Sequence, residues 1–80
     1  MTLRALKKPS IIEWGTYATL VRAEGQYIVR DRPKAIGEYG EFEQRFDNLS
    51  EAVTAFEERE ALLLAEQYAR AYPQLIQGGN

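Results

Sequence analysis

The sequence contains no cysteine and no histidine. Their absence excludes disulfide frameworks, zinc or haem sites built from those residues, cysteine nucleophiles and every histidine-based catalytic triad. It also leaves no side chain whose unperturbed pKa lies near neutral pH. We therefore expect a protein that is not an enzyme and that binds neither a metal nor a cofactor.

Long apolar runs are also missing. The longest, residues 61–65, is far shorter than the roughly 20 residues that span a bilayer. The basic residues Arg4, Lys7 and Lys8 are followed by neither an apolar stretch nor a small-residue cleavage site, so they do not resemble a secretory signal. No phosphate loop, dinucleotide fingerprint or calcium loop occurs. The expected location is the cytoplasm, without membrane contact.

The chain has 80 residues, of which 45% are apolar and 28% charged, and this is the composition of one small globular domain. Its net charge is only −2, but the two signs are separated along the chain. Residues 1–34 carry an excess of basic side chains and residues 35–80 an excess of acidic ones. This asymmetry predicts one basic and one acidic surface, unless folding interleaves them.

Three segments are typical of β-strands. Residues 16–22 and 26–30 are rich in β-branched and aromatic side chains, and Ala23-Glu24-Gly25 between them predicts a hairpin with a three-residue loop. That loop places Leu20 opposite Ile28 and Val21 opposite Tyr27, whereas a two-residue loop would shift this pairing and mix the two faces. Residues 41–47 alternate strictly and predict a third strand. Its buried side carries Phe42 and Phe46, and its solvated side carries Glu41, Glu43, Arg45 and Asp47.

A long helix is predicted from about Glu51 to Tyr72. Ser50 is the expected N-cap, Glu51 lies in the first turn, and Pro73 prevents continuation. The expected inward stripe is Ala52, Val53, Phe56, Leu63, Leu64, Gln67 and Ala71, with Glu60 close to it.

These elements predict an α+β fold of two layers, a three-stranded antiparallel sheet packed against one long C-terminal helix. Residues 14–77 are expected to form the domain, residues 1–13 an N-terminal arm or a short edge strand, and residues 78–80 a disordered tail.

The second half of the predicted helix is apolar over most of its circumference, which one sheet cannot cover. Small domains without disulfides or metals often gain stability by association, so a homodimer is one expectation. Its interface would comprise Leu62, Ala65, Tyr68, Ala69 and Tyr72. The alternative is that the N-terminal arm folds back and covers this surface through Leu3, Leu6, Ile11, Ile12 and Trp14.

Two charged sets are candidates for partner binding. The acidic set comprises Glu38, Glu41, Glu43, Asp47, Glu51, Glu57 and Glu58. If these residues share one side, they would attract a protein complex with a basic nucleic-acid-binding groove; otherwise they form a solvated exterior. The basic set comprises Arg22, Arg30, Arg32 and Lys34 with Tyr17 and Tyr27, and could hold phosphates and stack bases. The pI near 5.1 makes direct nucleic-acid binding the weaker alternative.

The short, acidic, cysteine-free α+β layout resembles small phage or mobile-element proteins, in particular the anti-CRISPR inhibitors of type I systems. The strand-to-helix junction reads EFEQRFDNLSEAV over residues 41–53. The resemblance covers the whole chain in size and layout, and it includes no diagnostic motif. It implies an inhibitor that binds a type I surveillance complex (Cascade) in the host cytoplasm and blocks target DNA binding. The basic N-terminal third departs from a pure DNA mimic. The alternative function is a small nucleic-acid-binding or regulatory module that uses the basic hairpin.

Overall fold

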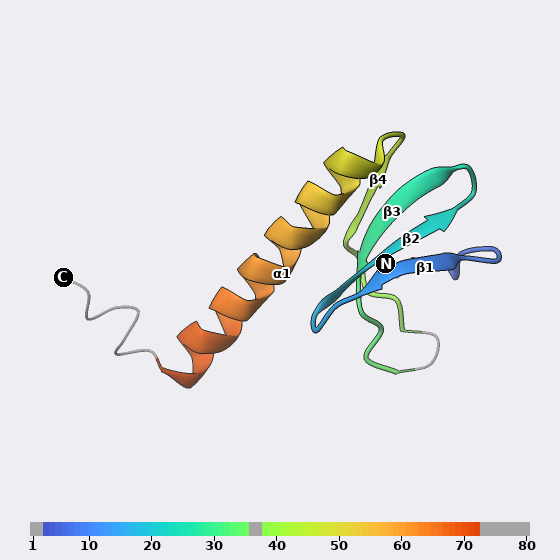
Figure 1. The fold of residues 1–80 in the computed structure, drawn as a ribbon. Helices are drawn as coiled ribbons and strands as arrows, with labels where there is room; N and C mark the ends of the chain where they lie inside the picture. Colours follow the sequence, from blue (N-terminus) through green and yellow to red (C-terminus); the bar gives the residue numbers. More distant parts are fainter. Residues whose placement is uncertain (1–2, 36–37, 73–80) are drawn as a thin grey trace.

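The computed structural model describes residues 3–35 and 38–72. The fold is α+β, as predicted, with an antiparallel sheet against one long helix (Figure 1). The strands are β1 (Ser10–Trp14), β2 (Ala18–Ala23), β3 (Gln26–Asp31) and β4 (Glu43–Phe46), and they neighbour one another in chain order. The helix, α1, spans Leu49–Ala71. Across the described ranges, no helix has both the length and the apolar character needed to cross a membrane.

The sheet has four strands rather than the three expected, because part of the N-terminal segment joins it as β1. This strand pairs antiparallel with β2, with Ile11 opposite Val21 and Trp14 opposite Thr19, and a β-bulge at Ile12 interrupts the register. Residues 10–14 therefore form an edge strand, one of the two interpretations of the N-terminal segment. The tail at 78–80 and the end of the expected domain at 73–77 lie outside the described residues.

The β2–β3 turn contains two residues rather than the predicted three. Glu24 and Gly25 have φ angles of 54° and 79°, so both lie in the left-handed region. Two consecutive residues of this kind are typical of a type I′ turn, whose twist matches the twist of the flanking strands. The preceding residue, Ala23, consequently belongs to β2 and pairs with Gln26.

The shorter turn changes the register of the hairpin. Leu20 lies opposite Val29 and Val21 lies opposite Ile28, so the predicted pairs were wrong by one residue. Because a one-residue slip exchanges the two faces of a strand, Val29 and Tyr27 lie toward the helix and Ile28 lies on the opposite face.

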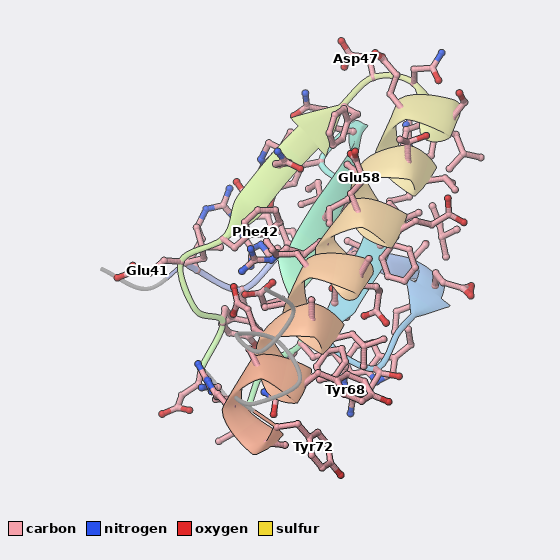
Figure 2. The ribbon with its side chains drawn as sticks, turned by 90° about the vertical axis from the view of Figure 1, so that its left-hand side faces the viewer. Glu41, Phe42, Asp47, Glu58, Tyr68 and Tyr72 are labelled. Atoms are coloured by element: carbon pink, nitrogen blue, oxygen red, sulfur yellow. The ribbon has the colours of Figure 1, made fainter. Side chains whose placement is uncertain are left out.

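The third predicted strand is present as β4 and has the expected apolar side. Phe42, just before the strand, and Phe46, at its end, both pack against the cluster beneath α1, and Figure 2 shows Phe42 between β4 and the helix. The other side was expected to be solvated, but Glu43 and Arg45 are half-buried there. They are half-buried because they take part in ion pairs across that face of the sheet.

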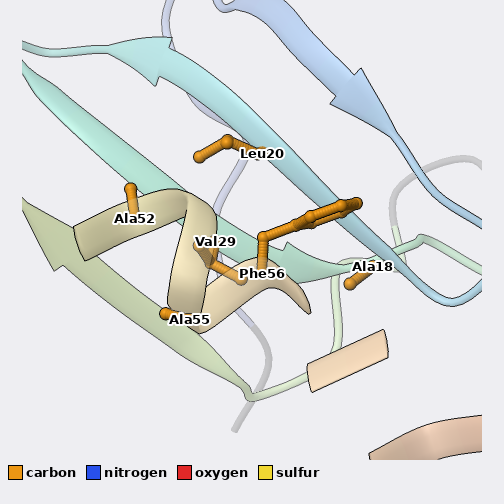
Figure 3. Close-up of a cluster of buried hydrophobic side chains, with 6 residues drawn as sticks. All are labelled: Ala18, Leu20, Val29, Ala52, Ala55 and Phe56. Atoms are coloured by element: carbon orange, nitrogen blue, oxygen red, sulfur yellow. The ribbon is translucent and has the colours of Figure 1, made fainter. Parts of the chain in front are cut away.

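Apolar side chains gather on both faces of the sheet. The larger cluster lies between the sheet and α1 (Figure 3) and comprises Ala18, Leu20, Val29, Ala52, Ala55 and Phe56. The opposite face, called the far face below, carries a smaller cluster of Val21, Ala23 and Ile28. Leu6 of the N-terminal segment packs on this smaller cluster. Leu6 therefore covers part of the far face, whereas Ile12 of β1 lines a groove on the helix side with Val53 and Phe56.

The helix begins two residues earlier than predicted, because Asn48 rather than Ser50 caps it. Asn48 has an extended backbone, and its side-chain oxygen accepts a hydrogen bond from the Glu51 N–H at 3.2 Å. Glu51 lies in the first turn, as predicted. At the other end, the helix stops at Ala71, two residues before Pro73.

Only the first half of α1 packs on the sheet. Its buried residues are Ala52, Ala55 and Phe56. The predicted inward stripe was wrong beyond Leu63, which is partly buried, because the following members are exposed: Leu64, Gln67 and Ala71. Figure 1 shows the reason, since the helix continues past the edge of the sheet. The sheet therefore offers the second half of the helix little to pack against.

Candidate binding surfaces

A chain of ion pairs crosses the far face and includes two of the residues predicted for partner binding. Arg30, which is 5% exposed, donates from Nε and Nη2 to one carboxylate oxygen of Glu43 at 2.9 and 2.7 Å, and from Nη1 to the Arg4 carbonyl at 2.6 Å. Arg45 donates to the other Glu43 oxygen at 2.9 Å and reaches Glu24 at 3.3 Å. Two bonds of 2.8 Å join Arg4 to Glu24. The network connects β3, β4, the β2–β3 turn and the N-terminal segment.

These arginines hold the two carboxylates in their charged form. The hydrogen bond from Arg4 is the main reason why the pKa of Glu24 is lowered to about 2. The pKa of Glu43 is lowered mainly by the hydrogen bond from Arg45, with a further contribution from Arg30. Because Arg30 and Glu43 neutralise each other within the fold, neither presents a free charge to a partner.

The rest of the basic set is divided between the two ends of the β2–β3 hairpin. Near the turn, the Arg22 guanidinium lies 4.4 Å from the centroid of the Tyr27 ring. Beyond the opposite end, the Arg32 guanidinium lies 5.1 Å from the Trp14 ring and donates to backbone carbonyls of the β1–β2 turn. Three members of the set line one groove there: Tyr17, Arg32 and Lys34. The structure therefore gathers half of the predicted basic set and separates it from the other half.

The seven acidic residues are likewise divided among several regions. Glu38 and Glu41 lie on the β3–β4 connection, Glu43 lies in the far-face network, and Glu57 lies on the flank of α1 beside the β1–β2 turn. The remaining three are placed where β4 meets the start of α1, and we call them the acidic corner: Asp47, Glu51 and Glu58. Figure 2 shows Asp47 at the start of the helix and Glu58 farther along it, with Glu41 at the other end of β4.

The acidic corner is exposed and carries unneutralised charge. Glu51 and Glu58 line one open groove with Phe46, and Asp47 accepts a hydrogen bond of 3.4 Å from the neutral side chain of Gln26. Among the described residues, none of the three carboxylates forms an ion pair. They contrast with Glu24 and Glu43, whose charges are matched by arginine.

Glu60 joins α1 to the β1–β2 turn. Its Oε1 accepts a hydrogen bond from the Thr16 N–H at 3.1 Å, and its Oε2 accepts from the N–H groups of Tyr17 and Ala18 at 2.7 and 2.5 Å. Gly15 makes this approach possible, because a Cβ there would lie 2.5 Å from Oε2. The sequence placed Glu60 near the inward stripe without indicating these partners. The one sequence feature that could have indicated this contact is a single carboxylate beside an apolar helix stripe.

A second helix-to-sheet contact was not predicted from the sequence. Arg59 donates from Nε and Nη2 to the two carboxylate oxygens of Asp31 at 2.7 and 2.8 Å, and its guanidinium lies 3.9 Å from the centroid of the Phe42 ring. The hydrogen bonds to Asp31 raise the pKa of Arg59 further above its usual value. Glu60 and Arg59 together join the middle of α1 to the sheet and to the β1–β2 turn.

In the second half of α1, the polar side chains and Leu63 lie on the side toward the sheet, and most of the large apolar side chains are exposed. Its polar residues Glu66, Gln67 and Arg70 line a groove of about 450 Å3 that also contains Arg32 and Lys34. The large apolar residues on the other side are between 46% and 53% exposed: Leu62, Leu64, Tyr68 and Tyr72. The N-terminal arm does not cover them, since Leu6 packs on the far face and Ile11, Ile12 and Trp14 belong to β1.

No grouping of three or more acidic side chains that could hold a metal ion occurs within residues 3–35 and 38–72. No family model, curated protein or solved structure matches this chain.

Proposed function

We propose that this chain is a non-enzymatic binding protein that contacts a basic partner through the acidic corner. The observation that carries the proposal is that Asp47, Glu51 and Glu58 are exposed and, within the described part of the chain, form no ion pair. Unneutralised carboxylates attract a basic groove and accelerate the encounter, and they lose little solvation until contact is made. The half-buried ring of Phe46 beside them adds an apolar contact.

The most specific form of the proposal concerns the partner. A type I CRISPR surveillance complex holds target DNA in a basic channel, and an inhibitor that occupies this channel keeps DNA out. The size and layout of the chain support this partner, and so does an acidic corner on an otherwise nearly neutral protein. Two of the seven basic residues of the N-terminal third, Arg4 and Arg30, are neutralised within the far-face network and oppose the interaction less than the sequence indicated.

Direct nucleic-acid binding is the second candidate, and one observation favours it. Arg32, Lys34 and Tyr17 gather in one groove with Arg70. The same groove contains Glu66, and Arg30 is buried and paired with Glu43, so the basic surface is smaller than the sequence indicated. This candidate therefore has weaker support than the acidic corner.

The test combines a type I surveillance complex with a labelled target duplex in an electrophoretic mobility shift. We expect the wild-type protein to prevent the shift, and Glu51→Lys to weaken its affinity for the complex by about tenfold, because a like charge would meet the basic groove. Glu38→Lys is the matched control: it makes the same charge change at an exposed residue on the β3–β4 connection and should inhibit like the wild type.

Two results would contradict the proposal. One is an unhindered shift of the duplex at saturating wild-type protein. The other is equal weakening by both lysine substitutions, which would mean that only net charge matters. If the protein instead shifts bare DNA, and Arg32→Ala with Lys34→Ala abolishes this, the second candidate is correct.

A further inference from the structure

The second half of α1 has its main apolar side facing away from the sheet, as in a helix that packs against a different partner. At 100° per residue, its solvent-facing apolar residues occupy a sector of roughly 160°. We call this sector the distal face; it comprises the exposed residues Ala61, Leu62, Leu64, Ala65, Tyr68 and Tyr72 and the partly buried Ala69. The polar residues Glu66, Gln67 and Arg70 lie on the side that lines the groove beside the sheet. A contiguous exposed apolar surface of this kind marks an interaction site.

We infer that the distal face binds the distal face of a second copy of this chain, with the two helices antiparallel and Ala65 near the twofold axis. In an antiparallel pair centred on residue 65, Ala61 lies opposite Ala69 and Leu62 lies opposite Tyr68. Alanines at 61, 65 and 69 repeat every four residues, so they form one row that allows the helix axes to approach closely. The larger side chains on either side of this row then fill the space between the helices.

The charge distribution selects this antiparallel arrangement. Glu57 and Glu58 continue the same sector of the helix toward its N-terminus, where both are exposed. In a parallel pair, these carboxylates would lie beside the same carboxylates of the other chain and repel them. In an antiparallel pair, Glu58 lies beside the Tyr72 hydroxyl of the other chain. Antiparallel helix dipoles also attract each other. A net charge of −2 per chain produces little repulsion at longer range.

The area available is sufficient for a weak dimer. Aromatic side chains carry about 200 Å2 each, and the large residues of the distal face are about half exposed, so each copy would bury on the order of 500 Å2. The total of roughly 1,000 Å2 is at the lower end of specific interfaces, so the expected dissociation constant is on the order of 10 µM. This pairing leaves Asp47 and Glu51 of the acidic corner exposed and places only Glu58 at the edge of the interface. The inference therefore goes beyond the proposed function and is tested without the partner.

The experiment is sedimentation velocity of the purified chain from about 1 µM to 1 mM, a range that brackets the expected constant. The wild type should pass from monomer to dimer. Ala65→Glu should weaken association by at least about tenfold, because it places two carboxylates at the axis. Gln67→Glu is the matched control: it adds the same charge on the groove side of the helix and should dimerise like the wild type. Ala65 is exposed, so circular dichroism should show an unchanged fold.

Mixing two variants tests the position of the axis. Ala65→Glu and Ala65→Lys should each be monomeric alone and should associate when mixed, because residue 65 of one copy lies beside residue 65 of the other. The inference is overturned if the wild type stays monomeric, or if Ala65→Glu dimerises as strongly as the wild type. It is also overturned if Gln67→Glu weakens dimerisation as much as Ala65→Glu, or if the mixed Ala65 variants do not associate. A monomer that co-sediments with phosphatidylcholine vesicles, and loses this binding in Ala65→Glu, would also overturn it and assign the face to lipid.

Discussion

Replacing the half-buried Glu60 with alanine should strongly destabilise the protein. The substitution removes the acceptor of three backbone N–H groups in and after the β1–β2 turn. The Thr16 N–H is exposed and can bind water instead, but those of Tyr17 and Ala18 are partly buried. Two hydrogen bonds to a charged acceptor at roughly 1.5 kcal/mol each amount to about 3 kcal/mol. A domain of this size has a free energy of unfolding of about 6 kcal/mol, so the expected loss is a large fraction of it.

The assay is urea unfolding followed by the fluorescence of Trp14, the only tryptophan in the chain, which directly precedes the turn. With a slope of about 1.5 kcal/mol/M, the midpoint should fall by roughly 2 M. Glu60→Gln should show a smaller loss, because one carbonyl oxygen can still accept. Glu57→Ala, which removes an exposed carboxylate from the same helix, should change stability by less than about 0.5 kcal/mol. A loss below about 0.5 kcal/mol for Glu60→Ala would refute the reasoning, since the three bonds would then contribute nothing.

Three further predictions follow from the structure. Asn48→Ala should lower the free energy of unfolding in urea by about 1 kcal/mol, whereas Ser50→Ala should leave it nearly unchanged. A larger decrease for Ser50→Ala than for Asn48→Ala would show that Ser50 is the cap. Leu20→Ala should lower the free energy of unfolding, measured with urea, by about 3 kcal/mol because Leu20 is fully buried. Leu64→Ala should lower it by less than about 1 kcal/mol, and equal decreases would show that Leu64 packs inward. The lowered pKa values of Glu24 (to about 2) and Glu43 mean that both carboxylates stabilise the fold fully above their usual pKa of 4.5, and that this contribution is lost as the pH falls from there toward 2. The urea midpoint should therefore decrease over that range, and less steeply in Glu24→Gln; parallel curves for the two proteins would show that Glu24 does not contribute.

Local sequence signals predicted the elements well, because short-range chemistry determines them. The strict alternation around Phe42 and Phe46 indicated both the strand and its buried side. The β-branched residues of the hairpin indicated two paired strands. The errors concern choices between neighbouring residues of similar chemistry. Asn48 and Ser50 are both good N-caps, and Glu24 adopts a positive φ that is unusual for a residue with a side chain.

The sites were harder to predict, because they depend on which distant residues the fold brings together. Arg30 and Glu43 belonged to separate predicted surfaces, yet they lie on adjacent strands and pair with each other. Helical periodicity identified an apolar sector beyond residue 61, but it could not show that α1 passes the edge of the sheet. Leu64 was therefore placed inside, although the structure leaves it on an uncovered face.

The first half of α1 completes the domain, and we propose its second half as a binding surface. Hydrogen exchange along the helix, followed by mass spectrometry at low and high protein concentration, tests this claim most directly. In dilute solution, amides around Ala52–Phe56 should exchange about 100-fold more slowly than those beyond Leu62, and raising the concentration should protect only the latter. Uniform slow exchange along the whole helix in dilute solution would contradict the account.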